Sequence, residues 1–168
     1  MIIHIDERRI RDCYVPQESD VTCWAACIRM IFNFYFPYPE PYQRPTEEVI
    51  LKLCPPRFGN KNDLIENLNR IVPIYRPDGT HETRKIAATW HAGPPTDDEL
   101  KAELGGGRPM IAVCPSDNNV SHVILIYGFV PERDGLQILD PYPELVNPNG
   151  ERMIFRRSVS ETWIVKVK

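Results

Sequence analysis

Cys23 is the first residue whose type and position can support chemistry. It follows residues 19–22 (SDVT), whose polar side chains are expected to cap a helix, and it opens the apolar segment 23–35. A helix N-terminus carries about half a positive charge and free N–H groups, which stabilise a thiolate and make it a usable nucleophile. Gln17 lies six residues upstream, where its amide can donate to an oxyanion together with the Cys23 backbone N–H. A lone cysteine at such a position is otherwise a small buried hydrophobe.

His122 and Asp140 are expected to meet across a hairpin. His122 opens the apolar strand 122–130, and Asp140 directly follows the strand 136–139. The short connection PERDG predicts antiparallel pairing, so the start of one strand lies next to the end of the other. Asp140 would then orient the imidazole and stabilise its cation, and the two residues would complete a nucleophilic triad with Cys23.

Other interpretations of these residues stay open. A histidine that opens a core strand is often structural, and Asp134 or Asn119 could be the third member of the triad in place of Asp140. Cys27, one helical turn further along the segment, is expected to pack in the core. The chain contains no C-x-x-C and no H-E-x-x-H pattern, so no metal and no other cofactor is expected.

Helices are expected mainly in the first half of the chain and strands in the second. Besides 23–35, the sequence predicts helices over 46–54, 62–71 and 97–104. Short segments rich in Val, Ile, Leu and Tyr predict strands over 110–114, 122–130, 136–139, 152–155 and 162–167. Three further segments are expected to be extended: 2–10 as an edge strand or arm, and 72–76 and 84–90 as strands or bridging segments. This order indicates an α+β fold with an antiparallel sheet and a buried central helix.

Size and charge bound the classes of function. The chain has 168 residues, 42% hydrophobic and 26% charged, as expected of one globular domain over 1–168 and not of a disordered chain. The formal net charge is −3, so the chain has no basic surplus that would indicate a nucleic-acid partner. No apolar run approaches the ~20 residues of a membrane span, so membrane insertion is not expected.

The N-terminus and the cysteines bear on the compartment. The first residues, MIIHIDERRIRD, lack the apolar core of a signal peptide. A cytoplasmic protein is therefore expected, with a secretion system that reads no signal peptide as the alternative route. The five cysteines are an odd number, and in a reducing compartment they are expected to be free thiols available for chemistry.

Four motifs, in this order, resemble the papain-like cysteine peptidases. They are Gln17, the run Cys23-Trp24-Ala25-Ala26, the run His122-Val123-Ile124 with Gly128, and Asp140-Pro141. The chain most resembles the short bacterial branches, the C39-type and staphopain-like peptidases, over roughly residues 10–145. The resemblance implies a papain-like cysteine proteinase fold, with an N-terminal helical half, a central buried helix and a C-terminal antiparallel sheet half.

The resemblance also implies an activity. It predicts a thiol protease that hydrolyses peptide bonds through Cys23, His122 and Asp140, with Gln17 in the oxyanion hole. Its expected partners are a protein or peptide substrate and an inhibitor or immunity protein, and its expected role is that of a bacterial effector, a toxin or a processing protease. Two alternatives remain: an acyltransferase or deamidase of the same fold and triad, and a catalytically silent binding module.

Overall fold

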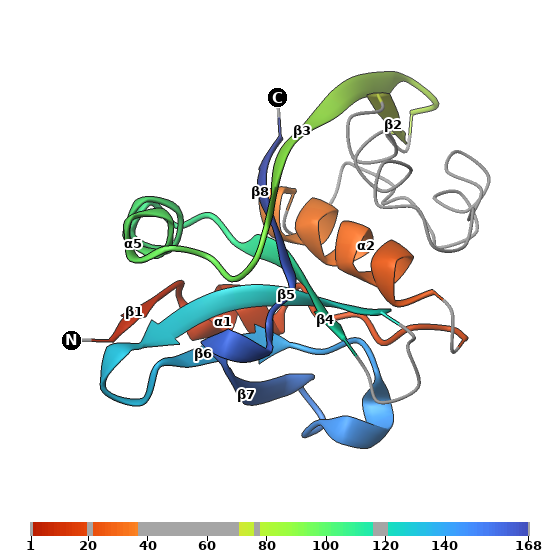
Figure 1. The fold of residues 1–168 in the computed structure, drawn as a ribbon. Helices are drawn as coiled ribbons and strands as arrows, with labels where there is room; N and C mark the ends of the chain where they lie inside the picture. Colours follow the sequence, from red (N-terminus) through yellow and green to blue (C-terminus); the bar gives the residue numbers. More distant parts are fainter. Residues whose placement is uncertain (1, 20–21, 37–70, 76–77, 116–120, 168) are drawn as a thin grey trace.

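The described strands of the molecule form one antiparallel sheet. The computed structural model describes residues 2–19, 22–36, 71–75, 78–115 and 121–167. Its strands are β1 Ile3–His4, β2 Ile71–Tyr75, β3 His81–Ala92, β4 Met110–Pro115, β5 Ser121–Val130, β6 Gly135–Leu139, β7 Glu151–Phe155 and β8 Glu161–Val167. Within these ranges the sheet has the order β2-β3-β8-β4-β5-β6-β7, and β1 pairs with β5 (Figure 1). The α-helices are α1 Glu7–Arg11, α2 Cys23–Tyr35 and α5 Asp97–Gly105.

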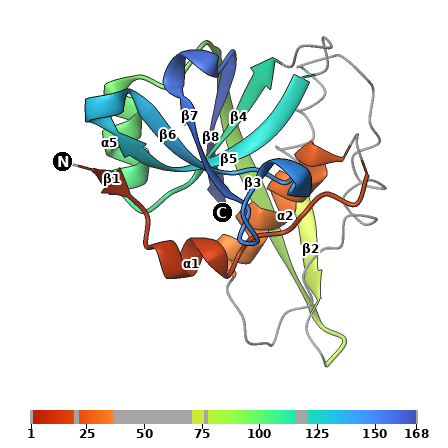
Figure 2. The same cartoon turned by 90° about the horizontal axis from the view of Figure 1, so that it is seen from below.

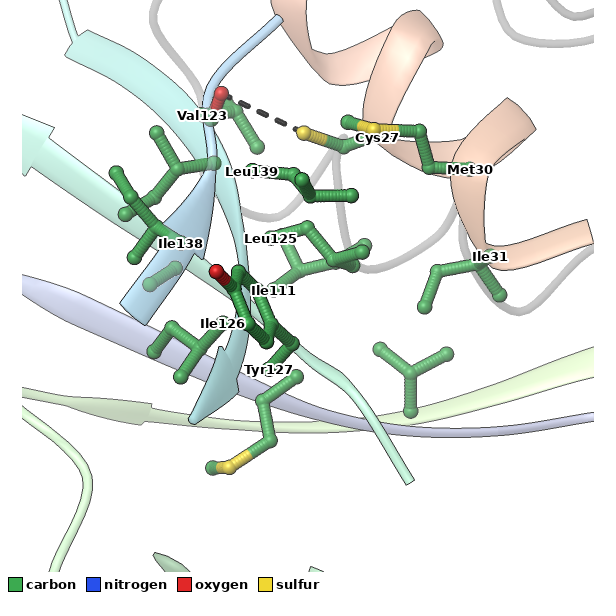
Figure 3. Packing of buried hydrophobic residues seen from close by; sticks show 14 of the residues in the cluster. Cys27, Met30, Ile31, Ile111, Val123, Leu125, Ile126, Tyr127, Ile138 and Leu139 are labelled. Carbon is green, nitrogen blue, oxygen red and sulfur yellow. Dashed lines mark hydrogen bonds between the residues drawn. The ribbon is translucent and has the colours of Figure 1, made fainter. Parts of the chain in front are cut away.

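Helix α2 lies at the centre of the core because almost every face of it is apolar. Figure 3 shows Met30 and Ile31 of this helix directed toward the buried side chains of the sheet, Leu125 among them. In this contact between α2 and β5, the Cys27 thiol donates to the Val123 carbonyl, with Sγ 3.4 Å from the oxygen. The structure therefore contains the buried helix over 23–35 that the sequence predicts, and Cys27 packs in the core.

Helix α5 is fixed at its start by a capping box. The Thr96 hydroxyl accepts from the Glu99 backbone N–H, and the Glu99 carboxylate accepts from the Thr96 N–H. Leu100 and Leu104 are buried and attach the helix to the sheet. In Figure 1, strands β3 and β8 run between α5 and α2, and Figure 2 gives the view from below with α1 and β1 toward the periphery.

The N-terminal part differs from the sequence-based expectation. Residues 2–10 are not one extended arm, because the Asp6 carboxylate accepts from the Arg9 N–H and caps helix α1, whose Ile10 is buried. The segments around 72–76 and 84–90 are the paired strands β2 and β3. Strands therefore come from both halves of the chain, and the first half is not purely helical.

Two of the predicted helices cannot be placed. The segments 46–54 and 62–71 lie outside the described residues, apart from Ile71, which begins β2. Among the helices that are described, none is long and apolar enough to cross a membrane.

Candidate active site

His122 and Asp140 contact each other where two paired strands end. The ladder between β5 and β6 reaches Leu125 opposite Leu139, so the first residues of β5 project past the end of β6 toward Asp140. His122 Nε2 lies 2.6 Å from Asp140 Oδ1 in a hydrogen bond. The structure thus brings together the two residues that the hairpin between 122 and 139 predicts to be neighbours, although the ladder contains a β-bulge after Ile126.

The carboxylate of Asp140 is fully buried and surrounded by polar partners. The residue is 0% exposed. Its Oδ1 also accepts from the Tyr142 N–H at 2.9 Å. Arg152 Nη1 lies 3.2 Å from Oδ2, which is an ion-pair distance without the alignment of a hydrogen bond. A buried carboxylate needs such partners, because transfer from water costs several kcal/mol when the charge is left alone.

Gly150 fixes the loop that holds Asp140. Its carbonyl accepts from the Asp140 N–H at 2.8 Å. Its φ is +75°, in the left-handed region, and an added Cβ would overlap the ring of Tyr14. Tyr14 therefore packs directly on the backbone that positions Asp140, and glycine is required at position 150.

Cys23 begins helix α2 and is 7% exposed. Its side chain is one of the groups that raise the pKa of His122, and His122 in turn contacts Asp140. Burial lowers the pKa of His122, but the hydrogen bonds and the charges of Asp140 and Cys23 outweigh this effect and raise that pKa to about 9. At neutral pH the arrangement therefore favours an imidazolium beside the sulfur atom.

The start of α2 is not capped in the way that the sequence predicts. Thr22 is the N-cap residue, but its side chain makes no hydrogen bond to the helix. The Thr22 hydroxyl instead donates to the Ser19 carbonyl at 3.0 Å and accepts from the Ser19 N–H at 3.1 Å. Because the Thr22 hydroxyl is bonded to Ser19, it does not occupy the free backbone N–H groups at the start of α2.

Gln17 lies in the loop before α2, tied to the strand end that carries Asp140. Its backbone N–H donates to the Pro141 carbonyl at 2.8 Å, and its Nε2 donates to the Ser19 carbonyl at 2.8 Å. Its Oε1 is buried without a hydrogen-bond partner among the residues described. One amide hydrogen is thus used within the loop, and the amide group carries a second one.

Two of the other described cysteines, Cys27 and Cys114, are poorly suited to nucleophilic chemistry. Burial raises the pKa of Cys27 well above its ordinary value, and it raises that of Cys114 to about 11. Cys54 lies outside the described residues. Over the described ranges, no group of three or more His, Cys, Asp and Glu side chains is placed to hold a metal ion.

Sequence reasoning missed two neighbours of the site, Arg152 and Tyr142. The Tyr142 ring lies edge-on to the His122 ring, with centroids 6.4 Å apart. Arg152 lies opposite Ile138 in the ladder between β6 and β7. That register would have placed Arg152 near Asp140, but the long connection between the two strands leaves the register open in the sequence.

Comparison with solved structures identifies the fold. The chain is similar to the crystal structure of the peptidase domain of Streptococcus ComA, a bi-functional ABC transporter involved in a quorum-sensing pathway. The TM-score is 0.60 and the identity 14%, and the match covers 90% of this chain and 95% of that domain. The chain therefore shares the fold of this peptidase domain.

The family follows from the sequence. Residues 13–165 match the model of the Peptidase_C39 like family, so the chain belongs to this family and is a cysteine peptidase. The matched range includes Gln17, Cys23, His122 and Asp140. No curated protein sequence matches the chain.

Proposed function

We propose that this chain hydrolyses peptide bonds with Cys23 as the nucleophile, His122 as the acid and base, and Asp140 as the residue that orients His122. The observation that supports the proposal is the hydrogen bond between His122 Nε2 and Asp140 Oδ1 at 2.6 Å, together with the effect of Cys23 on the pKa of His122. The family supports a protein or peptide as the substrate.

The chemistry follows from the order of the contacts. The Cys23 thiolate attacks the peptide carbonyl carbon, and the developing oxyanion accepts hydrogen bonds from the Cys23 backbone N–H and from Gln17 Nε2. The His122 imidazolium then gives its proton to the leaving amine, and an acyl-enzyme remains on the sulfur. Neutral His122 next takes a proton from water, whose oxygen attacks the thioester carbon. Collapse of this second intermediate releases the acid product and restores the thiolate–imidazolium pair.

The test is a cleavage assay in which a single sulfur atom is removed. A peptide library from a digested proteome is incubated with the wild-type protein and with Cys23→Ala, and new termini are identified by mass spectrometry. Cleavage should be abolished in Cys23→Ala while the fold survives, since loss of a triad nucleophile costs about 10⁶-fold in kcat. Cys13→Ser is the matched control, because Cys13 is buried elsewhere and its thiol donates to the Ile10 carbonyl, which a hydroxyl can also do.

Two results would contradict the proposal. Cleavage that persists in Cys23→Ala would remove Cys23 as the nucleophile. Conversion of peptide amides to acids without cleavage would indicate the deamidase alternative. In each case the folded state of the variant is checked by thermal unfolding.

Alkylation of the thiols tests the resting state independently of a substrate. Iodoacetamide at about pH 6 should label Cys23, because the neighbouring imidazolium stabilises its thiolate. Cys27 and Cys114 should stay unlabelled, since burial raises the pKa of both. Labelling of Cys23 no faster than a model thiol, or equally fast in His122→Ala, would show that the ion pair does not form.

A further inference from the structure

Arg152 faces the oxygen of Asp140 that His122 does not use. Asp140 Oδ1 is engaged by His122 Nε2 and by the Tyr142 N–H. Asp140 Oδ2 takes part in no aligned hydrogen bond among the described residues, and Arg152 Nη1 lies 3.2 Å from it. The Asp140 side chain is 0% exposed and that of Arg152 is 34% exposed, so the guanidinium reaches from the surface to a buried anion.

The proposed reaction is assisted by such a cation. While His122 is protonated, its charge balances that of Asp140. Once His122 has given its proton to the leaving group, Asp140 would be a buried carboxylate facing a neutral ring, which is costly. A second cation at Oδ2 removes this cost and makes it easier for His122 to release the proton.

Arg152 is suited to this role because the other titratable groups around Asp140 do not supply a cation. Three of them face it from neighbouring elements: Tyr14 before α2, Cys27 on α2, and Cys114 on β4. Burial raises the pKa of each of the three, so they are neutral at pH 7. A guanidinium stays charged over the whole accessible pH range.

We propose that Arg152 is a positioning residue that neutralises Asp140 while His122 is uncharged, and that it thereby keeps His122 able to give up its proton. The kinetic consequence of this role rests on the proposed function, but its effect on the His122 ring does not. No substrate is needed to measure that effect.

The test compares ring titrations of His122 by NMR in the wild type, Arg152→Gln and Arg152→Lys. The wild-type midpoint should lie near the pKa of about 9. In Arg152→Gln the midpoint should rise by about one pH unit, because the lone carboxylate holds the imidazolium more tightly. Arg152→Lys should stay close to the wild type, since lysine remains charged to about pH 10. The His122 signals are assigned by comparison with His122→Gln.

Arg157→Gln is the matched control. Arg157 follows the same strand, and its guanidinium lies over the Phe155 ring, 4.8 Å from the centroid. Its replacement should leave the His122 titration unchanged. In the cleavage assay, Arg152→Gln should lower kcat by up to about tenfold, the equivalent of one pH unit, without raising KM. Arg157→Gln should change neither value.

Two outcomes would overturn the role of Arg152: a His122 midpoint in Arg152→Gln that equals or falls below the wild-type value, or an Arg152→Lys midpoint shifted as far as that of Arg152→Gln. Thermal unfolding checks that the variants fold, and Arg152→Met is a second uncharged variant of similar length. If the wild type cleaves no peptide, the proposed function fails, while the titration still decides the role of Arg152.

Discussion

The described part of this molecule contains two histidine–carboxylate pairs with different surroundings, His122 with Asp140 and His91 with Glu99. His122 Nε2 is 2.6 Å from Asp140 Oδ1, and the side chains are 23% and 0% exposed. His91 Nε2 is 3.0 Å from Glu99 Oε1, with side chains 32% and 24% exposed, and these atoms lack the alignment of a hydrogen bond. The two pairs are similar in composition and distance but differ in what surrounds them.

The difference shows that the other contacts of the carboxylate and of the histidine determine what a histidine–acid pair can do. Glu99 closes the capping box of α5, where it accepts from the Thr96 N–H at 2.7 Å and from the Thr96 hydroxyl at 2.8 Å. Burial raises the pKa of Glu99, but these bonds and the His91 charge lower it overall. Asp140 instead contacts an imidazole whose pKa Cys23 also raises. The first pair stabilises a helix end, and in the proposed mechanism the second moves a proton.

Replacing each histidine in turn should give the largest difference in cleavage rate between the two pairs. His122→Ala should lower peptide cleavage by about 10⁴-fold, since a triad without its base retains little more than substrate binding and the oxyanion hole. His91→Ala should change it by less than about twofold, because surface pairs contribute little. The rates are compared on the library peptide that the wild type cleaves fastest. Similar losses in the two variants would make the two pairs equivalent.

Removing the acids should give a smaller effect. Asp140→Ala should lower kcat/KM by about 10- to 10³-fold, which corresponds to about 1.4–4 kcal/mol of transition-state stabilisation. Asp140→Asn should keep more activity, because an amide can still hold the ring through a hydrogen bond. Glu99→Gln is the matched control and should leave kcat/KM unchanged. Full activity in Asp140→Ala would remove Asp140 from the triad.

Gln17→Ala tests whether Gln17 is an oxyanion donor in the site that contains His122. The rate should fall by about 10²-fold with little change in KM, as for the loss of one such donor. Glu18→Gln is the adjacent control, because Glu18 is paired with Arg29 at 3.0 Å and lies on the surface. A wild-type rate in Gln17→Ala would place Gln17 outside the oxyanion hole.

The smallest expected effect is on the pH dependence of stability, and its sign differs between the pairs. The folded pKa of His122, about 9, lies above its ordinary value of 6.5. Its stabilising contribution is therefore complete below about pH 6.5 and is lost as the pH rises through about 9. The pKa of Glu99 is lowered from 4.5, so its contribution is present above about pH 4.5 and is lost as the pH falls through the folded value.

Thermal unfolding of two variants measures these opposite trends. His122→Gln should reduce the loss of stability on the alkaline side, and Glu99→Gln should reduce it on the acid side. A flattening on the same side in both variants would contradict the assignment of the two pairs.

The sheet of this protein was largely predictable because its strands are short apolar runs bounded by Pro, Gly, Asn and Asp. The strands predicted over 110–114, 122–130 and 136–139 lie within one residue of β4, β5 and β6. The contact of His122 with Asp140 follows from a short hairpin connection that leaves little freedom in register. Helix α2 was equally clear, since its apolar residues cover nearly the whole circumference.

The features that the sequence could not reveal depend on which of several possible partners a side chain bonds to in the folded chain. The Thr22 hydroxyl has two uses, a helix cap or a turn with Ser19, and the turn prevails. Residues 7–11 form a helix because a single carboxylate, Asp6, caps it, a local signal too short for periodicity to detect. Arg152 reaches Asp140 only through the register across a long connection.

The contact between Gly150 and Tyr14 has a consequence for engineering the substrate range of this peptidase. Tyr14 lies three residues before Gln17, whose N–H is bonded to the Pro141 carbonyl, and Gly150 holds the N–H of Asp140. The segment that enters the helix and the loop that leaves β6 are thus joined by both a ring contact and a backbone bond. In a mutant library, any side chain at position 150 should misalign both walls of the site together, so diversity belongs at other positions and this codon is best held constant.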